Sequence, residues 1–194
     1  MGKIFCLMGK SSSGKDTIYT RLKEDSTLRL TPLVTYTTRP IRCGEVNGRE
    51  YNFIDIETLN KYRDESRLIE SRVYHTVNGD WYYATIDDGQ LSSGENFILI
   101  TTLDSFTSLK NYLGEEDVIP YYIEVEDGLR LERAIARERT QASPNYNELC
   151  RRFIADSQDF SEERLKECRV NNRYMNYDLN DCIDSIKKDI LSRI

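Results

Sequence analysis

The stretch Gly9-Lys10-Ser11-Ser12-Ser13-Gly14-Lys15-Asp16-Thr17 decides the fold, because it joins an apolar run to an amphipathic segment through a glycine-bracketed loop. The run before it, residues 4–8, is apolar throughout, as expected of a strand that is buried on both faces. The two glycines let successive backbone N–H groups point inward and make a cradle for an anion. Lys15 adds positive charge, and a helix over residues 16–24 would direct its positive end to the same place. The stretch predicts the phosphate-binding loop of a nucleotide enzyme.

One position of this loop departs from its usual pattern. The residue after the loop lysine is ordinarily a Ser or Thr whose hydroxyl binds Mg²⁺, and here it is Asp16, followed by Thr17. A carboxylate beside a triphosphate is repelled unless a cation lies between them. Two interpretations stay open: Asp16 binds the metal directly or through water, or Asp16 caps the helix while Thr17 binds the metal.

Composition limits the classes of protein to which the chain can belong. Its 194 residues suffice for one sizeable core and fall short of two ordinary independent domains. Acidic residues outnumber basic ones by 33 to 27, which argues against nucleic acid or an anionic membrane as the main partner. Five scattered cysteines without CxxC spacing predict neither a disulfide framework nor a zinc site, and the single His75 is expected at the surface. We expect a cytoplasmic protein without a signal peptide or membrane span.

The order of predicted elements indicates an α/β core. Predicted strands at residues 3–8, 97–101 and 121–125 are followed by predicted helices at 16–24, 104–113 and 128–139. This alternation is typical of a parallel sheet flanked by helices. In the third helix the inward residues are expected to be Leu129, Leu131, Ala134 and Ile135.

Two segments differ from this core pattern. The first segment predicts a small, mostly antiparallel module inserted into the core. It contains short aromatic and β-branched runs at residues 33–37, 50–54, 68–74 and 81–85. Turn signals at 46–48 and 77–80 and a predicted helix at 56–67 separate these runs. Residues 140–145 predict a mobile loop, and 147–165 a helix that buries Leu149, Phe153 and Ile154. A short strand near 175–177 and a helix over 179–194 are expected to end the chain.

A second motif runs from Thr35 to Phe53. It reads much like TTRxxRxGExxGxxYxF, and the matching residues are Thr37, Thr38, Arg39, Arg42, Gly44, Glu45, Gly48, Tyr51 and Phe53. Together with the phosphate loop, Leu68-Ile69-Glu70, Trp81-Tyr82-Tyr83 and the arginine-rich residues 133–152, it resembles the guanylate kinase family over essentially the whole chain. The resemblance implies a single domain of the P-loop nucleoside monophosphate kinase type: a parallel core (1–32, 86–136 and 156–194), an acceptor-binding module (33–85) and a short helical lid (137–155).

The resemblance assigns a phosphate site to this motif. Arg39 and Arg42 lie three residues apart on a turn stiffened by Pro40, so they can present forked donors to one phosphate. Tyrosine hydroxyls can complete the phosphate's shell without adding charge, and the family pattern implies this role for Tyr51 and Tyr83. Alone, such residues would more often be a solvated basic turn and core tyrosines.

The resemblance also implies a base-reading carboxylate, Glu70. Guanine offers adjacent N1–H and N2–H₂ donors that a carboxylate accepts as a pair, whereas adenine presents a lone pair at N1. Thr35, Thr85 and Thr102 fall at positions that contact the acceptor base. Thr102 departs from the family, whose LDID-like strand end carries an acid there; Asp104 follows and is expected to cap the next helix. We hypothesise that the metal's carboxylate has moved from this strand end to Asp16.

The donor side is implied by the same resemblance. The ATP-binding residues would be Gly9, Ser11, Ser12, Ser13, Gly14, Lys15, Asp16, Thr17, Arg133 and Asn176, with Mg²⁺ at Asp16 and Thr17. The catalytic residues would be Lys15, Arg39, Arg137 and Arg152, with the lid arginines moving in on closure. The implied reaction is ATP + GMP to ADP + GDP, without a covalent intermediate.

Three alternatives stay open at this point. The same fold could phosphorylate another nucleoside monophosphate or a phosphorylated sugar, and a non-catalytic binding module would share the fold. Intact Gly14, Lys15 and Arg39 favour an enzyme over a binding module. A helix carrying Arg133 and Arg137 would, taken alone, more often be a solvated face. We expect small nucleotides as partners, no nucleic acid, no membrane, and a monomer or homodimer.

Overall fold

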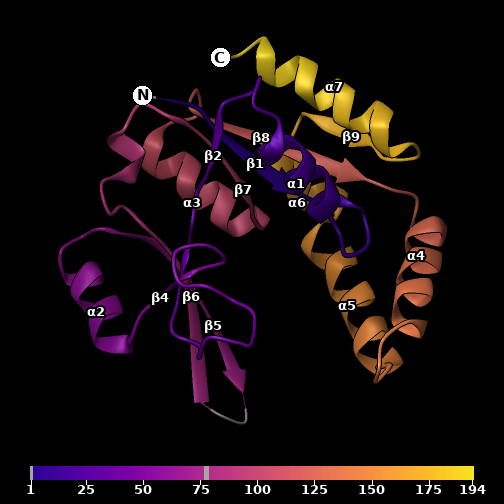
Figure 1. Ribbon diagram of the computed structural model, residues 1–194, viewed down its shortest axis with the longest axis horizontal. Coiled ribbons are helices and arrows are strands. Elements are labelled where there is room, and N and C mark those ends of the chain that lie inside the picture. Colours follow the sequence, from indigo (N-terminus) through magenta and orange to yellow (C-terminus); the bar gives the residue numbers. More distant parts are fainter. Residues whose placement is uncertain (1, 77–78) are drawn as a thin grey trace.

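The computed structural model describes residues 2–76 and 79–194, which form two sheets and the helices around them (Figure 1). The larger sheet is parallel throughout and has the order β2-β7-β1-β8-β9. Its strands are β1 (Ile4–Met8), β2 (Leu30–Pro32), β7 (Asn96–Ile100), β8 (Val118–Glu124) and β9 (Arg173–Met175). The predicted parallel sheet is confirmed. β2 was not predicted, because three residues give no readable periodicity.

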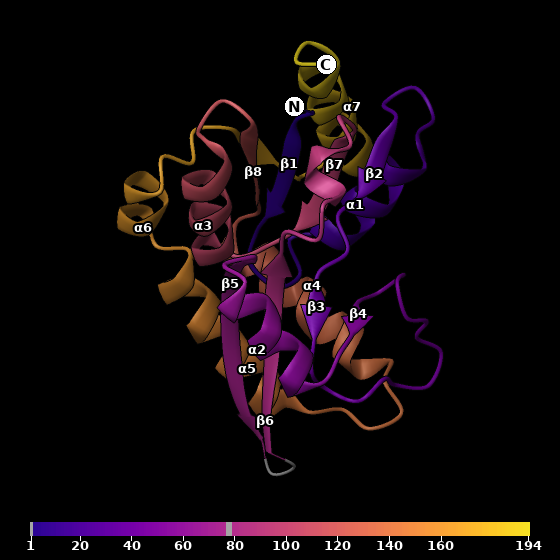
Figure 2. The same cartoon turned by 90° about the vertical axis from the view of Figure 1, so that its left-hand side faces the viewer.

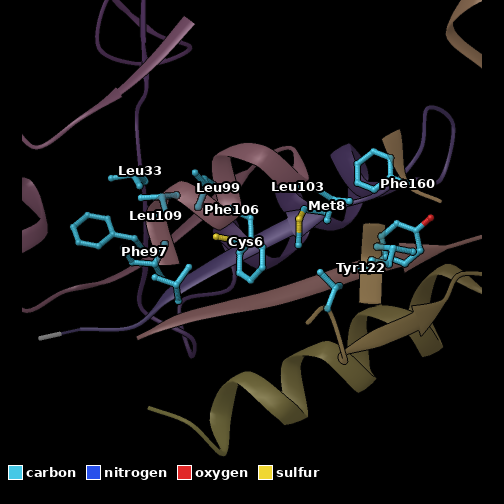
Figure 3. Packing of buried hydrophobic residues seen from close by; sticks show 14 of the residues in the cluster. Cys6, Met8, Leu33, Phe97, Leu99, Leu103, Phe106, Leu109, Tyr122 and Phe160 are labelled. Atoms are coloured by element: carbon cyan, nitrogen blue, oxygen red, sulfur yellow. The ribbon is translucent and has the colours of Figure 1, made fainter. Parts of the chain in front are cut away.

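Helices cover both faces of this sheet, which explains why β1 is apolar at every position. Cys6 and Met8 point to one face, where they pack with Phe106 of α3 (Leu103–Leu113) and Leu165 of α6 (Glu162–Glu167) (Figure 3). The alternate residues of β1 pack with α1 (Lys15–Glu24) and α7 (Leu179–Leu191) on the opposite face. Figure 2 shows α3 and α6 on one side of the sheet and α1 and α7 on the other.

A second sheet of order β4-β3-β6-β5 lies beyond the carboxyl end of β7 (Figure 2). Its strands are β3 (Tyr36–Thr37), β4 (Asn52–Phe53), β5 (Leu68–Thr76) and β6 (Gly79–Ile86). The pairs β3–β6 and β5–β6 are antiparallel, and the pair β3–β4 is parallel. The prediction of a mostly antiparallel module is confirmed. Helix α2 (Ile56–Asp64) packs Leu59 against this sheet and ends three residues before the predicted limit. The turn predicted at 77–80 falls partly outside the described residues.

Two helices, α4 (Asp127–Arg139) and α5 (Tyr146–Asp159), lie side by side and project away from the sheet (Figures 1 and 2). The single helix predicted over 147–165 is wrong, because Ser161 accepts a hydrogen bond from the Arg164 N–H and starts the separate helix α6. α5 has no buried residue, and Ile154, expected inside, is 60% exposed.

The buried face of α4 also differs from the prediction. Its buried residues are Arg130, Ala134 and Glu138, while Leu129, Leu131 and Ile135 are only half-buried. The apolar pattern failed because charged side chains with polar partners occupy the interface with α5. Arg130, for example, pairs with Asp127 and Asp156.

Smaller expectations concern the cysteines, the histidine and the membrane. All five cysteines are free, and the His75 side chain is 77% exposed beside Asp80. Within the part of the chain that the structure describes, no helix has both the length and the apolar character needed to cross a bilayer.

Candidate active site

The loop between β1 and α1 has the backbone shape of a phosphate cradle. Ser12 and Gly14 adopt φ values of 64° and 86°, in the left-handed region. At Gly9 an added Cβ would lie 2.7 Å from the Ile123 carbonyl oxygen, so a side chain there would push the loop away from β8. Gly14 begins α1 without a side-chain cap, which leaves the first N–H groups of the helix to be satisfied by a ligand or water.

A buried asparagine just after β9 holds this loop, and an arginine of α4 holds that asparagine in turn. Asn176 is 3% exposed, and its Nδ2 donates to the Ser13 carbonyl oxygen at 2.7 Å. An added Cβ at Gly14 would lie 2.4 Å from that Nδ2, so the glycine is required by packing as well as by φ. Arg133 donates to the Asn176 carbonyl oxygen at 3.1 Å. Asn176 and Arg133 thus shape the cradle, whatever further contact they make with a nucleotide.

The predicted lid arginines lie beside the loop. Arg152 donates to the Ser11 hydroxyl at 3.0 Å, and Arg137 lines with it a cavity of about 170 Å³ between the loop and helices α4 and α5. Ser11 also donates its backbone N–H to Asp156 at 2.7 Å. Asp156 in turn pairs with Arg130, which is 1% exposed.

The Asp156 and Arg130 contacts were missed from the sequence. Each residue taken alone reads as part of a solvated helix face, and only the packing of α5 against the loop reveals the pair. The pair ties the projecting helices to the phosphate loop.

Asp16 faces the space between the two sheets. Its side chain is 79% exposed, lies 3.4 Å from the Lys15 ammonium, and lines a cleft of about 790 Å³ with Thr35 and Tyr51. Because Gly14 is the cap of α1, the interpretation in which Asp16 caps the helix is wrong. Thr17 is exposed on the same first turn.

The residues present fit a magnesium ion held mainly by a nucleotide. A single carboxylate in an open cleft is the kind of oxygen ligand that Mg²⁺ takes beside substrate phosphates. Among residues 2–76 and 79–194 there is no cluster of three or more His, Cys, Asp or Glu that would hold a metal by itself.

Arg39 is the fixed centre of the predicted acceptor phosphate site. It is 4% exposed, donates to both oxygens of Glu45 at 2.6 and 2.8 Å, and donates from Nε to the Tyr83 hydroxyl at 3.1 Å. The guanidinium also lies 5.3 Å from the ring centroid of Tyr51. Hydrogen bonding to Arg39 lowers the pKa of Glu45 to about 2, and the same bond raises the pKa of Arg39.

Glu45 orients the second arginine as well. One of its oxygens accepts the backbone N–H of Arg42 at 2.8 Å. The Arg42 side chain then lines, with Tyr51 and Tyr83, a cavity of about 390 Å³. The four residues predicted for the acceptor phosphate therefore converge.

The predicted base-reading residues line a smaller pocket of about 60 Å³. Glu70 lies there with Thr35 and Thr85, and its side chain is 10% exposed. The Thr85 hydroxyl donates to Glu70 at 2.9 Å, which fixes the carboxylate. Thr35 and Tyr51 line both this pocket and the 790 Å³ cleft, so the two spaces adjoin.

Thr102, also predicted to contact the base, does not line this pocket but a neighbouring cavity of about 140 Å³ that it shares with Arg72. Thr102 is the cap of α3, where its hydroxyl oxygen accepts the Ser105 N–H. The capping role expected of Asp104 is therefore wrong; Asp104 pairs with Arg164 instead. Thr102 also accepts a hydrogen bond from Arg72 at 3.2 Å. Arg72 carried no signal in the sequence, because a charged residue in a strand ordinarily faces solvent.

Comparison with known proteins agrees with this geometry. The family model described as guanylate kinase matches residues 1–89. The chain is 32% identical over 141 residues to the guanylate kinase of Oleidesulfovibrio alaskensis, an alignment that covers 72% of this chain and 66% of that relative. It is 25% identical over 193 residues to the guanylate kinase of Porphyromonas gingivalis, covering 98% and 97%. A crystal structure of guanylate kinase from Anaplasma phagocytophilum has the same fold, with a TM-score of 0.67, 19% identity, and 98% and 85% coverage.

Proposed function

We propose that this chain, which belongs to the guanylate kinase family, transfers the γ-phosphoryl group of ATP to the phosphate of GMP, giving ADP and GDP. The observation that carries the proposal is the 790 Å³ cleft. It is lined by Asp16 at the phosphate loop and by Thr35 and Tyr51, which also line the pocket of Glu70. Two nucleotides can therefore meet across one space.

The donor half of the reaction falls to the loop and the lid. Backbone N–H groups of residues 9–15 bind the ATP phosphates, and Lys15 places its charge at the β- and γ-phosphates. Arg137 and Arg152 border the same loop and stabilise the negative charge that spreads over the transferring phosphoryl group. Because they lie on projecting helices, closure of residues 137–155 over ATP would bring them nearer and exclude water.

The acceptor half falls to the module of residues 33–85. Arg39 and Arg42 bind the GMP phosphate with the hydroxyls of Tyr51 and Tyr83, which aligns an acceptor oxygen with the γ-phosphorus. Glu70 accepts the N1–H and N2–H₂ donors of guanine. No side chain forms a covalent bond, so the rate comes from alignment and charge stabilisation.

Magnesium is the expected cofactor. Asp16, with Thr17 as its neighbour, would hold the ion beside the ATP phosphates, because Asp16 follows the phosphate loop directly and lines the cleft. When bound, the ion neutralises charge on the β- and γ-phosphates.

An acceptor panel tests the proposal. In a coupled assay of ADP release with saturating ATP, GMP should give a higher kcat/KM than AMP, CMP, UMP and phosphorylated sugars. Glu70→Gln removes the paired acceptor of guanine and should lower kcat/KM for GMP by about 10²-fold or more, because a site built to hydrogen-bond its substrate discriminates strongly when one partner is lost. Glu57→Gln, on the exposed face of α2, is the matched control and should change nothing. ADP release that no acceptor stimulates would contradict the proposal.

A further inference from the structure

Two charged residues at the base of the projecting helices take no part in the function described so far. Arg130 on α4 is buried, and Asp156 on α5 is half-buried. Arg130 precedes the predicted lid of residues 137–155, and Asp156 follows it directly. A charge that is removed from water is costly unless other groups replace the water, so the partners of these residues indicate their role.

Both residues contact the phosphate loop at Ser11. The Ser11 backbone N–H donates to Asp156 Oδ2 at 2.7 Å, and the Ser11 carbonyl oxygen accepts from Arg130 Nη1 at 3.3 Å. The same Nη1 atom lies 3.3 Å from Asp156 Oδ2, which closes a network between the loop, α4 and α5. Both backbone polar groups of Ser11 are therefore held by the base of the helices.

Arg130 is fixed by further contacts on its other sides. Its Nε and Nη2 donate to Asp127 Oδ1 at 3.1 and 3.0 Å. Its guanidinium carbon lies 4.0 Å from the ring centroid of Phe153 on α5. Because its nitrogens and its flat face all have partners, Arg130 has one defined position, and it gives Asp156 and Ser11 a fixed support.

The contact at Ser11 also places a proposed catalytic residue. Arg152 lies four residues before Asp156 on α5, one helical turn away on the same face. Its Nη2 donates to the Ser11 hydroxyl at 3.0 Å while Asp156 accepts the Ser11 N–H. Arg152 is exposed, so the position of α5 determines where its charge lies relative to the loop.

We propose that Asp156 is a positioning residue for phosphoryl transfer: together with Arg130 it holds the base of α5 on Ser11 and so places the Arg152 guanidinium at the phosphate loop. The inference rests on the proposed function, because it acts through the charge that Arg152 supplies to the transferring phosphoryl group. Such a charge is effective when it is held in place before the reaction begins. Without Asp156, Arg152 is present but no longer held at the loop.

A double-mutant cycle between Asp156 and Arg152, in the full chain, tests the inference. Asp156→Asn keeps the size of the side chain and removes the charge that pairs with Arg130. In a coupled assay of ADP release, with ATP and GMP varied in turn, it should lower kcat about tenfold, less than the cost of a full misplacement. KM for GMP should stay unchanged, because the proposed GMP-binding residues lie outside α4 and α5.

The second half of the cycle separates positioning from general support. Arg152→Met should lower kcat by about 10²-fold, the size of effect expected when a charge or donor is removed from a transition state. In that background Asp156→Asn should lower kcat by less than about twofold, because a positioning residue has no effect once the group that it positions is gone. Partial unfolding would instead lower kcat by the same factor in both backgrounds.

Two further variants serve as control and as safeguard. Asp159→Asn is the matched control, because Asp159 is an exposed aspartate of α5 that pairs with Arg164, and it should leave kcat unchanged. Arg130→Met combined with Asp156→Leu replaces the buried pair by apolar side chains of similar size, a change that is often neutral for stability. This double variant should unfold at a urea midpoint close to that of the wild type and still lose at least as much kcat as Asp156→Asn.

Several outcomes would overturn the inference. These are equal factors of loss with and without Arg152, a kcat in Asp156→Asn and in the double variant within about twofold of the wild-type value, or a rise in KM for ATP at unchanged kcat. An Arg152→Met variant as active as the wild type would overturn it as well, since the positioned group would then have no role. A wild type that releases no ADP with any acceptor would instead refute the proposed function.

Discussion

The donor and acceptor halves of the site are built from different chemistry. The proposed donor half is one continuous loop, residues 9–14, whose backbone N–H groups would bind the phosphates of any nucleotide and whose shape is held by Asn176 and Asp156. The acceptor half is assembled from side chains on β3, β5, β6 and the turn at residues 39–45. Backbone N–H groups that contact only phosphates cannot distinguish one base from another, whereas side chains that contact the base can. We therefore expect the acceptor half to set substrate specificity and the donor half to supply general phosphate binding.

The largest effect is expected from the donor half, at Lys15. Lys15→Met removes the cation that we propose lies at the β- and γ-phosphates, and we expect kcat to fall by about 10³-fold, the size of effect seen when a preorganised charge or donor is removed from a transition state. The loss should be the same for every acceptor tested. Lys61→Met, an exposed lysine of α2, is the control. A fall in kcat that differed between acceptors would show that Lys15 also contributes to acceptor specificity, which would contradict the separation of the two halves.

In the acceptor half we expect a substitution to lower activity by misorienting Arg39. Glu45→Gln leaves Arg39 in place but removes the carboxylate that accepts from two of its nitrogens. We expect kcat/KM for GMP to fall by about 10²-fold, because small misplacements of a positioning group cost this much, while KM for ATP stays unchanged. Steady-state kinetics with each substrate varied in turn separate the two. A matching rise in KM for ATP would show that the halves are coupled.

The same division explains how much of the fold and site the sequence could predict. The phosphate loop is contiguous, so its glycines, Lys15 and the buried Ile18 and Leu22 of α1 were all readable from local pattern. The parallel sheet followed from alternating elements. The features that the sequence did not predict were either too short to show a pattern, such as the three-residue strand β2, or dependent on packing, such as the polar contacts of Arg130.

The acceptor half was predicted from the family resemblance, since its residues are dispersed along the chain. Residues that match the family pattern, such as Arg39 and Glu70, were named from the sequence. Arg72 was not, because no local rule separates a strand arginine that faces a carboxylate from one that faces water. The Thr102 cap was missed for a related reason: an Asp two residues later was an equally good capping residue by type.

A variant at Asp16 tests whether the carboxylate that binds the metal has moved from the strand end at Thr102 to the start of α1. Asp16→Asn keeps the size of the side chain and removes its charge, so the half-saturating Mg²⁺ concentration should rise about tenfold, within the range found when a group supporting a metal is removed. Activity at saturating Mg²⁺ should largely return. Titration of activity with Mg²⁺ at fixed ATP measures this, and Thr17→Val is the companion variant that tests the neighbouring hydroxyl. An unchanged Mg²⁺ requirement in Asp16→Asn would remove Asp16 from the metal site.

The smallest effect concerns stability in acid, and it isolates the acceptor half without any nucleotide. Hydrogen bonding to Arg39 lowers the pKa of Glu45 from 4.5 to about 2, so the folded protein keeps this carboxylate charged where the unfolded chain protonates it. A depressed pKa contributes stability that is complete above the unfolded value and is lost as pH falls toward the folded value. The urea midpoint of the wild type should therefore exceed that of Glu45→Gln by a constant margin from pH 7 to about 5, and the margin should narrow below about pH 4.5. Because all other carboxylates are common to both proteins, their titration cancels in the difference. A margin that kept its full width down to pH 3 would mean that the Arg39–Glu45 pair positions the arginine without stabilising the module that carries it.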